Sequence, residues 1–504
     1  MRSSLFITAL LISCGSVRAQ DPAGFEATAA SAINRVIDAQ AFSNGFWGIH
    51  VVDLESGRTV YARNAAKSFV PASNVKLYTT AAALDLLGPS YRYETRVYVD
   101  GPVEDGVLHG NVIVRGAADP TIGGHYEADT GEWNEDVDAL RTFRDWADSL
   151  RSAGIRRIEG DLIGDDDVID DEPLGSNWSW DDETYYYSAQ LAGLAFHDNV
   201  VHMYVAARAP DMPAEIRWEP FDTDYIDVIN RTWTDDRAGS IDEGYRRFRG
   251  TNRVEVTTIV PMGGRDVEEI TVENPTRYFV HVLRESLLRS GIAVSGNAVD
   301  VDELSIKPDY QDPRYRRVAV HRSDPLSRIA ALINKPSQNL YADLLLKTLG
   351  AELPGEDEEF EPGSAEAGAA AATTTFVRAG IDTSRVRLAD GSGLSRLNLV
   401  TPEMTTSLLR YMWDHEDRRT REAFYNSLPT AGLHGTLRHR FGGGPARGVM
   451  RGKTGSLSFA SSLSGYLRTG DGRSLAFSIM SNHYTSRTSR VRAAQDAIVN
   501  LLSR

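Results

Sequence analysis

The chain has 504 residues, a length that predicts about two or three domains rather than a single core. A hydrophobic content of 41% supplies enough apolar side chains for globular domains. The formal net charge is −16, which argues against a nucleic acid as partner, because the phosphate backbone selects positively charged surfaces.

The N-terminus is typical of an export signal. Arg2 precedes an apolar run over residues 5–12, and the small residues around Ala19 resemble a cleavage site. We expect residues 1–19 to be a signal peptide and the protein to be periplasmic or otherwise in the cell envelope. In the alternative, the residues before Cys14 resemble a lipobox, and this single cysteine anchors a lipoprotein. No other stretch approaches the ~20 apolar residues that a membrane-spanning helix needs.

The apolar periodicity differs between the ends and the middle of the chain. Residues 92–315 are acidic, loop-rich and β-rich, with one helix expected over 274–291. The elements expected outside this region are strands over 46–52 and 59–62, a helix from Ser73 to Gly88, helices over 326–333 and 339–349, a hairpin over 459–467 and 474–480, and a last helix over 487–502.

Three short motifs stand in order along the chain: Ser73-Asn74-Val75-Lys76, Ser337-Gln338-Asn339 and Lys453-Thr454-Gly455. S-x-x-K, S-x-N and K-T-G are the parts of a serine acyl-transfer site that uses lysine in place of histidine. Only six of the 54 basic residues are lysine. Of these six, only Lys76 has a serine three residues before it, and only Lys453 opens K-T-G. Arginine cannot release its proton and a buried lysine can, so lysine stands where the motifs need a base.

The first motif supplies the expected nucleophile and base. Ser73 alone could be a helix cap, but the three motifs together favour Ser73 as the nucleophile and Lys76, one helical turn later, as the base. Lys76 must then be neutral, held so by burial and by a positive charge on Lys453.

The other two motifs supply proton transfer and binding. We expect Ser337 to relay a proton to the leaving group and Asn339 to pair with a substrate amide. Thr454, Gly455 and Ser456 should bind substrate, because K-T-G is expected on an edge strand facing the helix. The backbone N–H groups of Ser73 and Ser456 are the expected oxyanion donors.

The long gap between Ser73 and Ser337 predicts a split domain. Residues 20–92 and 316–504 are expected to form the catalytic domain, and residues 93–315 an inserted region. Such an insertion costs little closure entropy if it folds by itself.

Several stretches extend the agreement beyond the motifs: residues 71–76, 116–121, 334–339, 390–396, 428–437 and 452–457. With the motifs, they resemble the penicillin-binding proteins of the D-alanyl-D-alanine carboxypeptidase/endopeptidase type, the low-molecular-mass class C group (peptidase family S13). The resemblance implies an α+β fold, with a β-lactamase/transpeptidase-like catalytic domain, an antiparallel sheet flanked by helices. It also implies two nested β-rich domains within 93–315, the inner one over about 205–290.

The same resemblance implies a serine-type D-Ala-D-Ala carboxypeptidase, often also a DD-endopeptidase. Its substrates would be peptidoglycan stem peptides, and β-lactams would be covalent inhibitors through a Ser73 acyl-enzyme. It assigns Ser392, Arg396 and Leu457 to the pocket for the substrate side chain. In the family, an aspartate of the inserted region contributes to this pocket. Asp165 is the best match to it, and a slip in the local alignment would assign Asp166 or Asp167 instead.

Two other functions remain open. A serine β-lactamase carries a deacylating glutamate, commonly in E-x-x-L-N, and that pattern is absent between Ser337 and Lys453. A non-catalytic envelope scaffold that binds peptides would not need the motif residues, all of which are present.

No cofactor is expected, because the chain has no Gly-rich phosphate loop. The spacing of the 11 histidines predicts no metal site either. The acidic run over 165–172 is expected to be a solvated loop.

Overall fold

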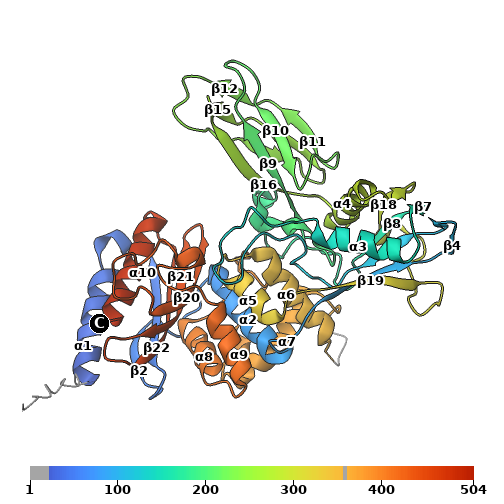
Figure 1. The fold of residues 1–504 in the computed structure, drawn as a ribbon. Helices are drawn as coiled ribbons and strands as arrows, with labels where there is room; N and C mark the ends of the chain where they lie inside the picture. The colour runs from blue at the N-terminus through green and yellow to red at the C-terminus, as the bar shows by residue number, and fades with distance from the viewer. Residues whose placement is uncertain (1–21, 356–359) are drawn as a thin grey trace, which may run out of the picture.

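The computed structural model describes residues 22–355 and 360–504 (Figure 1). The expected signal peptide over 1–19 and Cys14 lie outside these residues. No helix in the described ranges is long and apolar enough to cross a membrane.

A five-stranded antiparallel sheet joins the two ends of the chain. Its strand order is β2-β1-β22-β21-β20, and β1 pairs with both β2 and β22. The strands are β1 (Phe46–Asp53), β2 (Thr59–Arg63), β20 (Met450–Leu457), β21 (Ala460–Arg468) and β22 (Ser474–Asn482). Helices α1 (Pro22–Ile37) and α10 (Thr488–Leu502) cover one face, and α8 (Pro402–Trp413) covers the other (Figure 1).

The side chains of β22 alternate between the two faces of the sheet, and both faces are buried. Phe477 and Ile479 pack in one core with α1 and α10, while Ala476 and Met480 pack in the core that contains α8. Successive residues of a strand point to opposite faces, so one strand serves two cores. The predicted strands and hairpin are confirmed, and K-T-G does lie on an edge strand.

A cluster of helices packs around α2 (Val75–Leu86), which is buried along most of its length. Its neighbours are α5 (Leu326–Asn334), α6 (Asn339–Glu352), α7 (Ala365–Arg378) and α9 (Arg418–Ser427). A helix was expected to begin around Ser73. Helical structure does begin there, as a 3-10 turn over Ala72–Asn74 that leads into α2 at Val75.

The region between β2 and α5 builds separate sheets. A five-stranded sheet has the order β18-β8-β6-β3-β19, and helices α3 (Arg141–Ser152) and α4 (Pro275–Arg289) share its core. Its strands are β3 (Glu94–Val99), β6 (Val112–Arg115), β8 (Leu162–Asp165), β18 (Ala298–Asp300) and β19 (Arg316–Arg322). At its end lies a small sheet of β4 (Val103–Glu104), β5 (Val107–Leu108), β7 (Arg157–Ile158) and β17 (Ala293–Val294).

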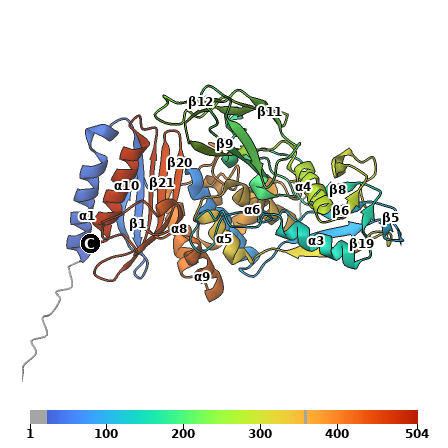
Figure 2. The ribbon, with the colours of Figure 1, turned by 45° about the horizontal axis from the view of Figure 1, so that its top comes forward.

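A second β-unit projects from the rest of the molecule, as Figures 1 and 2 show. It contains three small sheets and no long helix among the residues from β9 to β16. Its strands are β9 (Val200–Ala206), β10 (Glu215–Glu219), β11 (Asp227–Asn230), β12 (Trp233–Asp235), β13 (Tyr245–Arg247), β14 (Arg253–Val256), β15 (Ile259–Pro261) and β16 (Arg265–Thr271). The α+β fold class with β-rich insertions is therefore confirmed.

The strand pairing shifts the expected domain limits. Strand β19 pairs with β3, so the inserted sheet includes residues beyond 315. Helix α4 packs against β8 rather than belonging to the projecting unit. We propose an outer unit from Glu94 to Arg322 and an inner unit from Val200 to Thr271.

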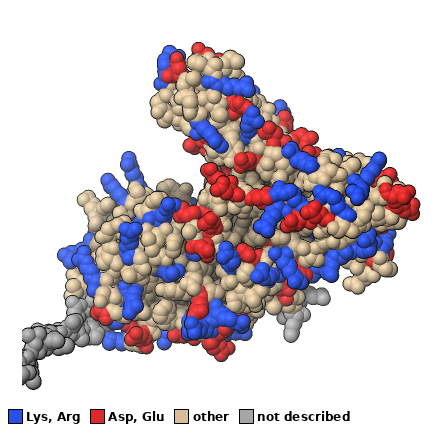
Figure 3. Space-filling model, in the orientation of Figure 1, with Lys and Arg blue, Asp and Glu red and all other residues tan. Residues whose placement is uncertain are grey.

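Charge of both signs is spread over the face drawn in Figure 3, where basic and acidic side chains are intermixed.

The acidic run over 165–172 is not the solvated loop that we expected. Asp165 is buried, and Asp170 forms an ion pair with Lys347 of α6 in which the side chains are only 8% and 4% exposed. This pair ties the inserted region to the helical cluster.

We predict that Lys347→Met lowers the free energy of unfolding by about 3–5 kcal/mol, because it leaves the Asp170 carboxylate buried without its cation. Lys307→Met is the matched control: this lysine pairs with Asp167 and Asp302 but is 45% exposed, and it should cost less than about 1 kcal/mol. Urea denaturation of both variants measures the difference. An equal loss of unfolding free energy in the two variants would contradict the burial of the Lys347–Asp170 pair.

Candidate active site

Ser73 lies in the 3-10 turn that precedes α2, with its side chain half-buried. The residue before it, Ala72, has φ 49°, a left-handed conformation that costs about 1–2 kcal/mol for a residue with a side chain. Ser337 of the second motif is also left-handed, at φ 74°. Strain of this kind persists where the surroundings hold a residue in place, and it is enriched at functional sites.

Lys76 is fully buried and donates three hydrogen bonds. Its Nζ lies 3.1 Å from Ser73 Oγ, 2.6 Å from Asn339 Oδ1 and 2.7 Å from the Ser392 carbonyl oxygen. The amine therefore joins the first motif, the second motif and the loop after α7 at one point.

Lys453 joins the second and third motifs. Its Nζ donates to Ser337 Oγ at 2.7 Å and to the Thr454 carbonyl oxygen at 2.9 Å. The Lys453 carbonyl oxygen in turn accepts from Asn74 Nδ2 at 2.9 Å. All five expected catalytic side chains are thus brought together: Ser73, Lys76, Ser337, Asn339 and Lys453.

Two glycines allow backbone to close around Ser73. A Cβ at Gly455 would lie 2.7 Å from the Pro71 carbonyl oxygen and 3.0 Å from Ser73 N. A Cβ at Gly393, where φ is 87°, would lie 2.0 Å from the Ala72 carbonyl oxygen. Strand β20 and the loop over 390–398 can approach the nucleophile turn only because neither position carries a side chain.

Asn339 is more engaged than the sequence suggested. Its Nδ2 donates to the Tyr187 carbonyl oxygen at 2.7 Å, in addition to the bond from Lys76 to its Oδ1. The amide donor that we expected to meet substrate is therefore paired with the inserted region. Sequence reasoning could not find Tyr187, because nothing local links it to the second motif.

Burial controls the protonation of the two lysines. Burial lowers the pKa of Lys76 to about 8, and the carboxylates of Asp343 and Asp390 act against this shift. Burial lowers the pKa of Lys453 well below its usual range, and the positive charge of Lys76 lowers it further. The carboxylates thus favour the proton on Lys76, whereas we expected the charge on Lys453.

Asp343 was missed by the sequence analysis. Its Oδ1 accepts from the backbone N–H groups of Gly391 and Ser392 at 2.7 and 2.9 Å, which fixes the carbonyl that binds Lys76. Burial raises the pKa of Asp343 to about 8, the charge of Asp390 raises it too, and Lys76 lowers it. Its place one helical turn after Asn339 on α6 was the available signal.

The residues expected to bind substrate fall into two groups. Thr454, Ser456 and Leu457 lie on the accessible edge of β20, and exposed Arg396 donates to the Ser458 carbonyl oxygen at 2.7 Å. Ser392, in contrast, is fully buried and contributes its carbonyl to Lys76, so it does not line an open pocket wall.

Asp165 lies at the end of β8, away from these contacts. Its carboxylate accepts from Tyr310 Oη and from the Asp167 N–H, both in the inserted region. Among the described residues none of its hydrogen-bond partners belongs to the three motifs. Its role in the pocket stays a prediction.

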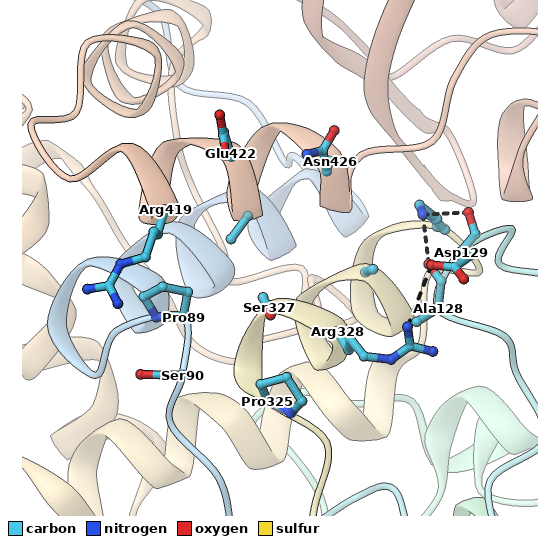
Figure 4. A pocket seen from close by; sticks show the side chains of 13 residues that line it. Pro89, Ser90, Ala128, Asp129, Pro325, Ser327, Arg328, Arg419, Glu422 and Asn426 are labelled. Atoms are coloured by element: carbon cyan, nitrogen blue, oxygen red, sulfur yellow. Dashed lines mark hydrogen bonds and ion pairs between the residues drawn. The ribbon is translucent and has the colours of Figure 1, made fainter.

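A pocket of about 460 Å³ lies near the second motif but away from the expected catalytic side chains (Figure 4). It is lined mainly by α5, α9 and the segment around Asp129, and none of the five expected catalytic residues lines it. Lys335 borders it and donates to the Ala128 and Asp129 carbonyl oxygens, each at 2.7 Å. These bonds make Lys335 a structural link between α5 and the inserted region.

Comparison with known proteins identifies relatives over most of the chain. A D-alanyl-D-alanine carboxypeptidase of an Actinomadura species is 33% identical over 92% of this chain and 82% of its own length. The D-alanyl-D-alanine carboxypeptidase DacB of Haemophilus influenzae is 27% identical over 87% of this chain and 86% of its own.

Solved structures show the same fold. Penicillin binding protein 4 (dacB) of Haemophilus influenzae superposes with a TM-score of 0.76 at 23% identity, covering 94% of this chain and 99% of that one.

The family model described as the D-Ala-D-Ala carboxypeptidase 3 (S13) family matches residues 29–504. The chain therefore belongs to the D-Ala-D-Ala carboxypeptidase 3 (S13) family.

Proposed function

We propose that this protein removes the terminal D-alanine from peptidoglycan stem peptides through an acyl-enzyme on Ser73, and that β-lactams acylate the same serine. The relatives support the reaction, since two of them are D-alanyl-D-alanine carboxypeptidases. A related structure, 23% identical, is a complex with a β-lactam. Its substrate places the enzyme outside the cytoplasmic membrane, in the periplasm or cell envelope.

The hydrogen bonds of Lys76 carry the proposal. Two of its three partners, Asn339 Oδ1 and the Ser392 carbonyl oxygen, can only accept. When Lys76 is neutral, its two N–H bonds stay with these acceptors and its lone pair is left facing Ser73 Oγ at 3.1 Å. The fold thus aims the base at the nucleophile.

Acylation follows from this arrangement. Ser73 Oγ attacks the carbonyl carbon of the penultimate D-alanine as Lys76 takes its proton, and the oxyanion forms between the N–H groups of Ser73 and Ser456. The C–N bond breaks, and the leaving amine of D-alanine receives a proton through Ser337. Water then hydrolyses the ester and releases the shortened peptide.

Substrate would complete the charge balance of the lysines. The terminal carboxylate of the peptide brings a negative charge toward Lys453, which favours the positive charge there. Ser337, bonded to Lys453, lies on the route for the proton. In the free protein the same proton is favoured on Lys76, so binding of the correct carboxylate activates the base.

The Ser73→Ala variant should lose release of D-alanine from diacetyl-Lys-D-Ala-D-Ala by at least about a thousandfold, because the acyl-enzyme cannot form. Exposed Ser384→Ala is the control and should keep full activity. Mass spectrometry after incubation with penicillin should find a stable adduct on Ser73, and fast turnover of penicillin would instead support the β-lactamase alternative. Release of D-alanine by Ser73→Ala at the wild-type rate would overturn the proposal.

The rate of Ser73 acylation should rise with pH through about 8, because Lys76 acts as a base only after it loses its proton. In Asp343→Asn the amide oxygen still accepts from Gly391 and Ser392, but the negative charge that this carboxyl gains as the pH rises through its pKa of about 8 is gone. The pKa of Lys76 then falls, and the rising limb should move to lower pH.

The matched control is Asp85→Asn, which removes a buried carboxylate at the other end of α2. It should leave the midpoint of the pH profile unchanged, whatever it does to stability. An unmoved profile in Asp343→Asn would show that this carboxylate does not act on the base.

Digestion of purified peptidoglycan should distinguish the two activities of this family. We expect D-alanine to be released from pentapeptide monomers. Loss of cross-linked dimers in separated muropeptides would identify DD-endopeptidase activity at the same serine. The Ser73→Ala variant should neither release D-alanine nor reduce the amount of dimer.

A further inference from the structure

Three histidines that are distant in the sequence meet where the inserted region adjoins the catalytic helices. His125 lies in the loop after β6, His197 opens a short 3-10 turn and His202 lies on β9, and all three are buried. Their ring centroids are 4.1–5.2 Å apart. One ring nitrogen from each lies within 4.8 Å of the other two.

Backbone contacts fix the tautomers of two of these rings. His125 Nδ1 lies 3.2 Å from the Asn134 carbonyl oxygen, and His197 Nδ1 lies 3.1 Å from that of Val200. A carbonyl oxygen can only accept, so each Nδ1 carries the hydrogen and each Nε2 presents a lone pair. Metal-binding histidines are oriented in this way, by a hydrogen bond from the nitrogen that does not bind the metal.

Three of the other four ring nitrogens have no hydrogen-bond partner among the described residues. His125 Nε2, His197 Nε2 and His202 Nδ1 are buried and accept no hydrogen bond from any described residue. Buried ring nitrogens without a hydrogen-bond partner are unfavourable, and a cation bound by all three removes this cost.

We propose that His125, His197 and His202 bind a divalent transition-metal ion, and that Zn²⁺ is the ion best matched to this site. Imidazole nitrogens are preferred Zn²⁺ ligands, with bonds of about 2.0–2.1 Å in a tetrahedral site. Such a site brings its nitrogens to roughly 3.3 Å from one another, so binding draws the three rings together.

The surroundings also suit a metal. Glu219 Oε2 lies 3.9 Å from His202 Nδ1 and is the carboxylate placed to reach a fourth position. Glu269 Oε1 lies 3.7 Å from His202 Nε2, on the other side of the ring, where it can orient the imidazole. Trp133 stacks on His125 with ring centroids 4.6 Å apart and covers the cluster.

The site would act on the catalytic centre by position. His197, Asp198 and Asn199 are all left-handed, at φ 54°, 56° and 56°. Asp198, between them, accepts from Tyr341 Oη at 2.8 Å and from Gln338 Nε2 at 3.3 Å. Gln338 is the middle residue of S-x-N, so a metal held by His197 fixes the strained turn that supports the second motif. The ion takes no part in acyl transfer.

Titration of the whole protein with Zn²⁺ and Co²⁺, after dialysis against a chelator, tests this proposal. We expect uptake of one ion per chain, a visible absorption spectrum of tetrahedral Co²⁺, and a Tm that rises by several degrees with Zn²⁺ concentration. His125→Gln and His202→Gln should each lower the affinity at least tenfold. His109→Gln, which changes an exposed histidine of the same inserted region, should leave it unchanged.

The outcomes separate the site from folding and from the proposed function. Near-ultraviolet circular dichroism and acylation by penicillin report whether each variant is folded. Absence of stoichiometric binding by the wild type overturns the proposal, and so does unchanged affinity in the folded cluster variants. If a variant does not fold, the wild-type titration and Co²⁺ spectrum decide. Metal uptake does not depend on the carboxypeptidase activity, so either result can stand without the other.

Discussion

The burial of one ammonium group organises the catalytic centre. A lysine amine taken out of water must find acceptors for its hydrogens, and Lys76 finds them on Ser73, Asn339 and Ser392. These residues belong to the nucleophile turn, to α6 and to the loop after α7, which are far apart in the sequence. The need to satisfy one buried charge therefore sets the mutual position of three segments. Asp343 strengthens the arrangement because its oxygen holds the Ser392 backbone, whose carbonyl accepts from Lys76.

The parts of the fold that depend on local pattern could be predicted from the sequence. The strands of the catalytic sheet, the terminal hairpin and α4, α5, α6 and α10 follow from periodicity and turn residues, and each lies within a few residues of its expected limits. The family and the α+β class followed from the three motifs and their surroundings. The left-handed conformation of Ala72, before the turn that carries Ser73, could not be predicted, because no sequence rule favours it for alanine.

The features that could not be predicted arise from tertiary contacts. The sequence identified both lysines but not the carboxylates beside Lys76, which favour the proton on that residue. Tyr187 reaches Asn339 through a backbone carbonyl, which any residue could supply. The histidines at 125, 197 and 202 follow no ligand spacing, because a loop, a 3-10 turn and a strand each contribute one. The acidic run looked solvated because its cation, Lys347, lies on a distant helix.

The two glycines beside Ser73 limit how such an enzyme can evolve under antibiotic selection. One way to exclude an inhibitor while still admitting the natural peptide would be to enlarge a side chain next to the nucleophile. At Gly455 and Gly393 that route is closed, since any side chain would collide with the backbone that carries Ser73. Variation that preserves activity is therefore confined to the rim, where Thr454, Leu457 and Arg396 retain accessible surface. The close packing that positions the nucleophile therefore also restricts which substitutions beside it the fold can accept.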